Sequence, residues 1–295
     1  MSRPTYIDIH SHVNFKAFDE DREAVIERAL ANDTWVINVG TQQDTSRHAV
    51  EMAEQYAEGV YAIIGLHPIH TGKSYHDTQE LGEGGAEFTS RGEVFDYEYY
   101  KKLASHPKVL GFGECGLDYY RLEEESIERQ KAAFVEHIKL ANDVGKPLML
   151  HIRNNPKDKG RASTDGARHD FAQSSAYRDA IELLREHATV KGDVHFFAGS
   201  WEEAKLFLDF GFTLSFTGVV TFTHDYDEVV RNTPLDMIMS ETDSPYITPV
   251  PYRGKRNEPM YVSEVVKKIA EIKGLPLETV SATLVDNAFR VFGLK

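Results

Sequence analysis

Short runs of apolar and β-branched residues recur along the whole chain and predict strands. Most of these runs are nearly continuous rather than alternating, which is typical of strands buried on both faces of a parallel sheet. Eight such runs occur, at residues 6–12, 34–40, 61–67, 109–114, 147–151, 191–197, 212–219 and 237–243. Stretches with apolar residues at helical spacing lie between most of them, at residues 21–31, 45–56, 127–144, 177–187 and 202–210. The pattern predicts strands and helices in alternation.

Eight strand–helix units in 295 residues predict an α/β fold, a (β/α)8 TIM barrel of eight parallel strands. A doubly wound open sheet is the alternative. It fits less well because no GxGxxG motif follows the first strand and eight units are more than that fold usually needs. We find no internal repeat, low-complexity tract or Pro/Ser-rich linker, so residues 1–295 are predicted to form a single domain.

Two connections are longer than ordinary βα loops, namely residues 71–97 after the third strand and residues 154–176 after the fifth. In a barrel, both loops rise from the face formed by the carboxyl ends of the strands, where active sites are built. A mobile surface insertion and an active-site lid are equally compatible with these two segments.

The amino-acid composition excludes several classes of protein and of metal site. With 41% hydrophobic residues and a net charge of −14, the chain is predicted to be globular, and no apolar run is long enough to span a membrane. The N-terminal residues lack a secretory signal, so a cytoplasmic location is expected. No obligate protein partner is expected either. The single cysteine, Cys115, excludes an internal disulfide and a Cys-rich zinc module. Any metal must therefore be held by histidines and carboxylates.

Several predicted strands end in His, Glu or Asp, at positions where a barrel brings all strand ends to one mouth. His10 and His12 lie two residues apart, so both side chains point to one face of a strand and can bind one cation. For that pair alone, histidines bonded to the backbone are the commoner explanation. The full set of predicted metal ligands is His10, His12, Glu114, His151, His195 and Asp243. Four imidazoles and two carboxylates suit two divalent ions, and the set does not distinguish Mg²⁺, Mn²⁺ and Zn²⁺.

Two carboxylates in this set are candidates for a catalytic role. Glu114 can bridge two ions by offering one oxygen to each, and Asp243 can also accept a proton from an activated water. A turn or N-cap role is the alternative for Asp243. The functional role is favoured, because the strand at residues 237–243 delivers this carboxylate to the same face as the histidines. Asp118, four residues past Glu114, is either a support for a ligand or a turn residue.

At these residues the chain resembles the TatD family of metal-dependent deoxyribonucleases, within the amidohydrolase-like hydrolases. The matching segments are residues 8–12, 65–68, 113–119, 150–153, 195–199, 241–246, 253–259 and 287–293. The resemblance implies that His10, His12, Glu114 and Asp243 hold one ion, and that Glu114, His151 and His195 hold the second. It also implies hydrolysis of DNA phosphodiester bonds, often from the 3′ end of single strands.

The overall acidity opposes the wrapping of long nucleic acid, but two segments are locally positive, residues 153–170 and 249–259. The residues expected to contact substrate are Arg153, Arg253, Arg256 and His67, with a structural role for His67 nearly as well supported. We therefore expect a 3′–5′ exonuclease whose partner is single-stranded DNA or a 3′ end. The alternatives are an amidohydrolase-type enzyme for a small amide, ester or phosphoester, and a barrel that binds without turnover. The intact set of ligands argues against the last.

Overall fold

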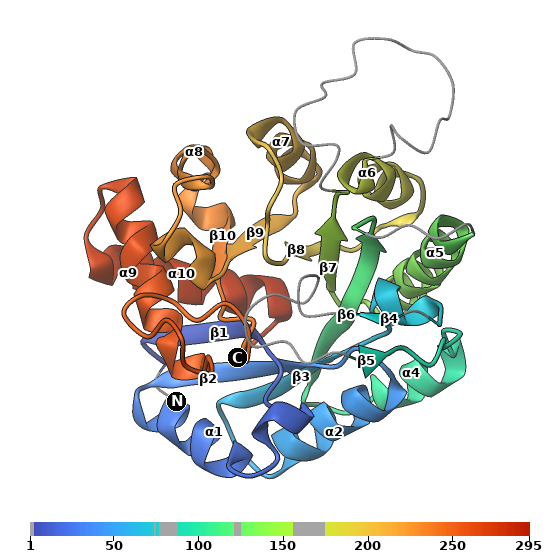
Figure 1. Ribbon diagram of the computed structural model, residues 1–295, viewed down its shortest axis with the longest axis horizontal. Helices are drawn as coiled ribbons and strands as arrows, with labels where there is room; N and C mark the ends of the chain where they lie inside the picture. Colours follow the sequence, from blue (N-terminus) through green and yellow to red (C-terminus); the bar gives the residue numbers. More distant parts are fainter. Residues whose placement is uncertain (1–2, 74, 77–87, 121–124, 156–174) are drawn as a thin grey trace.

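The computed structural model describes residues 3–73, 75–76, 88–120, 125–155 and 175–295. The described residues form an eight-stranded parallel sheet in the order β1-β2-β3-β6-β7-β8-β9-β10 (Figure 1). The strands are β1 (Tyr6–Ser11), β2 (Thr34–Val39), β3 (Val60–Ile64), β6 (Val109–Asp118), β7 (Leu148–Arg153), β8 (Gly192–Val194), β9 (Thr213–Phe216) and β10 (Ile238–Ser240).

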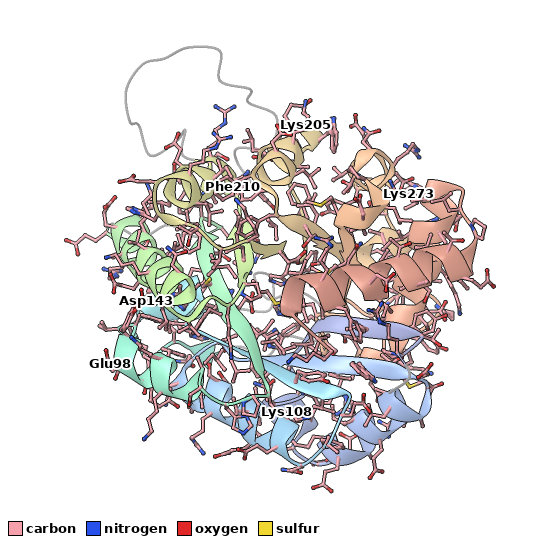
Figure 2. The ribbon with its side chains drawn as sticks, turned by 180° about the vertical axis from the view of Figure 1, so that it is seen from behind. Glu98, Lys108, Asp143, Lys205, Phe210 and Lys273 are labelled. Carbon is pink, nitrogen blue, oxygen red and sulfur yellow. The ribbon has the colours of Figure 1, made fainter. Side chains whose placement is uncertain are left out.

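Helices surround the strands as an outer ring (Figure 1). The α-helices are α1 (Arg22–Ala31), α2 (Gln43–Glu54), α4 (Tyr97–Leu103), α5 (Ser126–Val144), α6 (Ala176–His187), α7 (Trp201–Phe210), α8 (Asp227–Asn232), α9 (Val262–Lys273) and α10 (Leu277–Phe292). Short 3₁₀ turns are η1 (Lys16–Phe18), η2 (Pro68–Thr71), η5 (Gly218–Thr221), η6 (Leu235–Met237) and η7 (Pro259–Tyr261). Charged side chains such as Glu98 and Lys205 lie at the periphery of the ring (Figure 2).

The first and last strands meet and close the barrel. The backbone N–H of Asp243 donates to the carbonyl of His10 at 2.9 Å, and the N–H of His12 donates to the carbonyl of Ser244 at 2.8 Å. A parallel bridge joins Ser11 to Ser244. The closed sheet confirms the predicted TIM barrel, and it brings residues from the two ends of the chain to the same mouth.

Apolar side chains fill the space between the strands and the outer helices. Phe112 and Leu148 of the sheet belong to the same buried cluster as Phe134 of α5 and Leu184 of α6. Neighbouring strands approach closely in this core. At Gly192 an added Cβ would overlap the carbonyl oxygen of Leu148 on β7, so the close pairing of β7 and β8 needs a glycine there.

All eight predicted strands are confirmed, although β6 continues to Asp118 beyond its expected end and β8 and β10 are shorter than expected. The five predicted helices are also present. Four helices, α4, α8, α9 and α10, were not among the sequence-based predictions. The long connection at 71–97 begins at the last residue of η2 and includes the antiparallel pair β4 (Tyr75–His76) and β5 (Phe88–Thr89) and the start of α4. Residues 74 and 77–87 of that connection, and residues 156–174 of the other, lie outside the described residues.

Within the described part of the chain, the helices are all too short or too polar to cross a membrane.

Candidate metal centre

The six predicted ligands converge at the mouth of the barrel from five different strands. His10 lies on β1 and His12 follows it, Glu114 lies inside β6, and His151 lies on β7. His195 follows β8 and Asp243 follows β10. Parallel strands bring their carboxyl ends to one face of a barrel, which explains how residues far apart in sequence meet.

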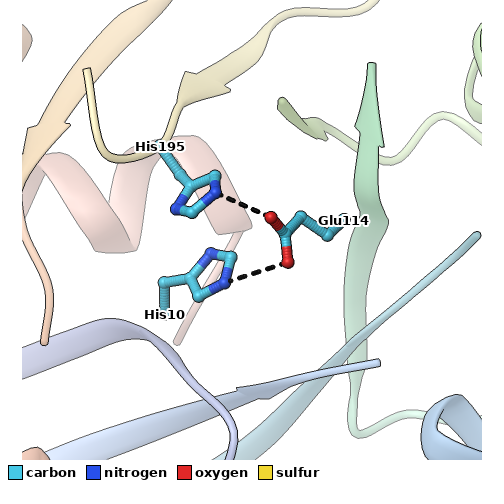
Figure 3. Close-up of side chains that lie close together, drawn as sticks. All are labelled: His10, Glu114 and His195. Atoms are coloured by element: carbon cyan, nitrogen blue, oxygen red, sulfur yellow. Dashed lines mark hydrogen bonds and ion pairs between the residues drawn. The ribbon is translucent and has the colours of Figure 1, made fainter. Parts of the chain in front are cut away.

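Glu114 is the centre of this cluster, because its two carboxylate oxygens face different groups of side chains. Oε2 lies 3.5 Å from Nε2 of His10 and 3.7 Å from Nε2 of His12. Oε1 lies 2.9 Å from Nε2 of His195 and 2.8 Å from Nδ1 of His151. Figure 3 shows the carboxylate between His10 and His195, with one oxygen directed at each ring. Glu114 thus has the geometry of a bridging ligand.

The first group consists of His10, His12, Asp243 and Oε2 of Glu114. Nε2 of His10 and Nε2 of His12 are 3.1 Å apart. Oδ1 of Asp243 lies 3.3 Å from Nε2 of His12 and 3.8 Å from Nε2 of His10. Ligands bound about 2.1 Å from one tetrahedral ion are separated by about 3.4 Å, so these spacings suit a single cation.

The second group surrounds Oε1 of Glu114 and contains His151, His195 and one further histidine. Nε2 of His67, from the turn after β3, lies 3.2 Å from Oε1. Glu114 belongs to two groups of side chains whose ligand atoms lie close enough to hold a cation, one with His67 and His151 and one with His10 and His195. The structure therefore brings all six predicted ligands together and places His67 beside them.

The far nitrogens of the four predicted histidine ligands fit a metal centre, since each contacts an acceptor and leaves the near nitrogen for a cation. Nδ1 of His12 donates to the carbonyl of Val39 at 2.9 Å. Nε2 of His151 lies 2.8 Å from Oδ2 of Asp118, so Asp118 contacts one of the predicted ligands. Metal-bound histidines typically donate their second N–H to a carboxylate or a carbonyl in this way.

The charges of the cluster favour a cation between its members. Burial raises the pKa of Glu114, but the histidines around it outweigh burial and hold that pKa well below its usual value. Burial lowers the pKa of His195, but Glu114 and Glu241 raise it well above the ordinary histidine value. The pKa of His10 is lowered by burial and by His195.

Buried acidic residues beneath the ligands were missed by the sequence reasoning. Glu241 accepts from Nδ1 of His195 at 3.3 Å and from the N–H of Phe196 at 2.7 Å. Asp8 accepts from the N–H of Thr242 at 2.8 Å and from its hydroxyl. A signal for them was present in the sequence, because an acidic residue stands two positions before a ligand in Asp8-Ile9-His10, Asp193-Val194-His195 and Glu241-Thr242-Asp243. Residues two apart on a strand share a face.

The turn that carries His67 is anchored to a helix by a buried histidine. Nε2 of His137, on α5, accepts the backbone N–H of Leu66 at 3.0 Å, and its Nδ1 faces the carbonyl of Ala133 at 2.7 Å. The close approach of Gly65 to the carbonyl of Gly113 leaves no room for a Cβ at this point. The third strand end is thereby fixed against β6.

The predicted substrate-binding arginines occupy different surroundings. The guanidinium of Arg153 lies over the ring of Tyr120 at 3.8 Å, and that of Arg253 lies over the ring of Phe222 at 3.9 Å. Arg256 pairs with Asp21 on both carboxylate oxygens and also with Glu258. These contacts tie the loop after β10 to the start of α1, and substrate binding by Arg256 stays a prediction.

Comparison with known proteins places this barrel among metal-dependent hydrolases. A family model described as TatD related DNase matches residues 7–293. The uncharacterized metal-dependent hydrolase YabD of Bacillus subtilis is 35% identical over 290 residues, covering 97% of this chain and 98% of that protein. The uncharacterized metal-dependent hydrolase TatD of Mycobacterium tuberculosis is 31% identical over 300 residues, covering 98% of each.

Solved structures show the same fold. The TatD homologue YjjV of Escherichia coli K12 superposes with a TM-score of 0.76 at 23% identity, with all of both chains covered. A TatD-family hydrolase from Entamoeba histolytica gives a TM-score of 0.73 at 21% identity, again over all of both chains.

Proposed function

The chain belongs to the TatD-related DNase family of metal-dependent hydrolases, and from that premise we propose that it hydrolyses DNA phosphodiester bonds. The proposed form of the activity is 3′–5′ exonuclease action on single-stranded DNA, in the cytoplasm. The observation that carries the proposal is the division of the Glu114 carboxylate between two groups of ligand atoms.

The donor set supports two divalent ions, Mg²⁺, Mn²⁺ or Zn²⁺. His10, His12, Asp243 and Oε2 of Glu114 would hold one ion, and His151, His195 and Oε1 of Glu114 would hold the other. When bound, such a pair lowers the pKa of a water and stabilises the oxygen that leaves the phosphorus. Imidazole and carboxylate oxygens together suit these metals and exclude a thiolate site.

Asp243 is the proposed general base. Its side chain is 13% exposed, compared with 5% for Glu114, so it is the ligand of the first group that water and substrate reach more readily. Its backbone N–H is held by the carbonyl of His10, which fixes the carboxylate beside the two histidines. In the reaction Asp243 accepts the proton of the attacking water, and Glu114 remains ionised as the bridging ligand.

Arginine and aromatic side chains beside the centre support a nucleic-acid substrate. Arg153 lies two residues beyond His151 on β7, and Phe222, beneath Arg253, is 43% exposed. Guanidinium groups bind phosphate, and exposed rings stack on bases without sequence preference. The proposal assigns phosphate contacts to Arg153 and Arg253. It keeps Arg256, which pairs with Asp21 and Glu258, as a further predicted substrate contact.

The test is the hydrolysis of single-stranded oligonucleotides labelled at the 5′ end or at the 3′ end, with each metal in turn. We expect a ladder that shortens from the 3′ end, is abolished by a chelator, and is reduced at least about 100-fold in Asp243→Asn. Asp209→Asn, an exposed position on α7, is the matched control and should cleave like the wild type.

Three results would contradict the proposal. Cleavage that survives the chelator would exclude a metal-dependent reaction. Equal cleavage in Asp243→Asn and Asp209→Asn would remove Asp243 from the mechanism. Absence of oligonucleotide cleavage with all three metals, together with metal-dependent turnover of a small phosphoester, would favour the small-molecule alternative.

A further inference from the structure

The tautomers of the histidines in this centre can be read from their hydrogen-bond partners. A neutral imidazole has one nitrogen that donates and one that accepts. The neighbour of the far nitrogen therefore decides whether the nitrogen facing the centre carries a proton or a lone pair. In the described part of the chain, five imidazoles face the carboxylates of Glu114 and Asp243, namely His10, His12, His67, His151 and His195.

Four of these rings have an acceptor at the far nitrogen. The carboxylates of Asp118 and Glu241 serve His151 and His195, and the carbonyl of Val39 serves His12. For His10 the acceptor is the sulfur of Met149, 3.0 Å from Nδ1. In the neutral form of each ring, the proton is on the far nitrogen and a lone pair is directed at the centre.

His67 is the exception, because its far nitrogen faces a donor. Nδ1 of His67 accepts the backbone N–H of Ile69 at 3.2 Å, and the ring thereby caps the N-terminus of η2. Pro68 begins this turn and has no N–H of its own. A lone pair must therefore lie on Nδ1, and the proton of the neutral ring must lie on Nε2, which is 3.2 Å from Oε1 of Glu114. A proton on Nδ1 would face the proton of Ile69.

The backbone holds His67 in this arrangement from both sides. Its N–H donates to the carbonyl of Thr41 at 2.9 Å, and its carbonyl accepts the N–H of His70 at 2.9 Å. The residue is 6% exposed, and its ring packs edge-on against that of His151 at 4.2 Å. The ring cannot turn over without losing the cap of η2.

We propose that His67 is a fixed hydrogen-bond donor to Glu114 and not a metal ligand. The proton on Nε2 occupies the lone-pair direction that a metal would need, and it binds the carboxylate oxygen that His151 and His195 also face. His67 thus acts as a positioning residue, which sets the rotation of the Glu114 carboxylate so that Oε2 is directed at His10 and His12. The assignment rests on the proposed function only in taking Glu114 as a metal ligand, and it requires no nuclease activity.

The first test is long-range ¹H–¹⁵N correlation NMR of protein labelled at histidine, before and after saturation with Zn²⁺. Signals of His67 are assigned by their loss in His67→Gln. We expect His67 to show a protonated Nε2 and an unprotonated Nδ1 in the zinc-loaded protein, whereas His151 shows zinc at Nδ1. Loss of the proton from Nε2 of His67 on zinc addition would overturn the proposal.

The second test compares zinc affinities of His67→Gln, His67→Ala and His151→Ala by competition with a chelating dye. Glutamine keeps an N–H donor, so we expect His67→Gln to bind within about 3-fold of wild type and His67→Ala to bind about 10–100-fold more weakly. His151→Ala is the ligand control. Equal losses in the two His67 variants, as large as that of His151→Ala, would identify a ligand. Neither measurement uses DNA, so failure of the nuclease proposal leaves both outcomes interpretable.

Discussion

The buried His137 predicts a measurable dependence of stability on pH. The ring is fully buried, with Nδ1 facing the carbonyl of Ala133 and Nε2 accepting the N–H of Leu66. Both nitrogens are thus satisfied only when the ring is neutral, because a proton on Nε2 would face the N–H of Leu66. Burial lowers the pKa of His137 to about 4.

The direction and the magnitude of the change in unfolding free energy follow from the pKa of His137 in the folded protein and in the unfolded chain. The unfolded chain, with a histidine pKa of about 6.5, binds the proton more readily than the folded protein, so the free energy of unfolding falls as the pH is lowered from about 6.5 to about 4. At about 1.4 kcal/mol per pKa unit, the protonation of His137 in the two states lowers the free energy of unfolding by about 1.8 kcal/mol between pH 7 and pH 5. Above about pH 6.5 the neutral ring makes its full contribution to the free energy of unfolding.

The assay is urea unfolding of wild type and His137→Gln at pH 7 and at pH 5. Glutamine retains an acceptor and does not titrate, so the variant should lose less stability than wild type on acidification. With an m-value of about 3 kcal/mol/M, the difference corresponds to about 0.6 M in the urea midpoint. His224→Gln, at a histidine whose side chain is 85% exposed, is the control and should follow wild type. Equal pH dependence in wild type and His137→Gln would refute the reasoning.

Three further predictions concern the metal, the core and the thiol. Zn²⁺ should bind more weakly and release more protons at pH 6 than at pH 8, because carboxylates raise the pKa of His151 and His195 against the effect of burial. Calorimetry in two buffers of different ionisation enthalpy measures the proton release. An affinity for Zn²⁺ that does not depend on pH would contradict this prediction. Gly192→Ala should destabilise the barrel by about 3 kcal/mol in urea unfolding, because the new methyl group overlaps the carbonyl of Leu148, and a wild-type midpoint would show that β7 and β8 can separate. Burial raises the pKa of Cys115, so this thiol should react with an aromatic disulfide reagent only after unfolding; rapid labelling of the native protein would show that the core opens.

The fold was predictable because continuous apolar runs and helical periodicity carry most of the information about a parallel barrel. The helices α9 and α10 were not predicted, because both follow the last strand and lie outside the alternation of strands and helices. The convergence of the six predicted ligands at one mouth was also predictable, because polar residues at the ends of buried strands have few structural reasons to be there.

The supports of the ligands were not predictable to the same degree. The contact between His195 and Glu241 joins residues of different strands, and its existence depends on the register between them. The tautomer of His67 depends on one backbone N–H in the following turn. The spacing of residues in the sequence predicts which side chains share a face of a strand. It does not predict which nitrogen of a histidine ring lies next to a hydrogen-bond donor.

The closure of the barrel has a consequence for how the protein is made. His10 lies on the first strand and Asp243 follows the last, and a backbone hydrogen bond joins the two at the seam. During synthesis from the N-terminus, a chain that has not yet reached Asp243 holds only part of the first ligand group. Interrupted translation or proteolytic loss of the last strand therefore yields fragments without a complete centre. Any activity that depends on the complete ligand group therefore requires a chain that contains both ends of the barrel.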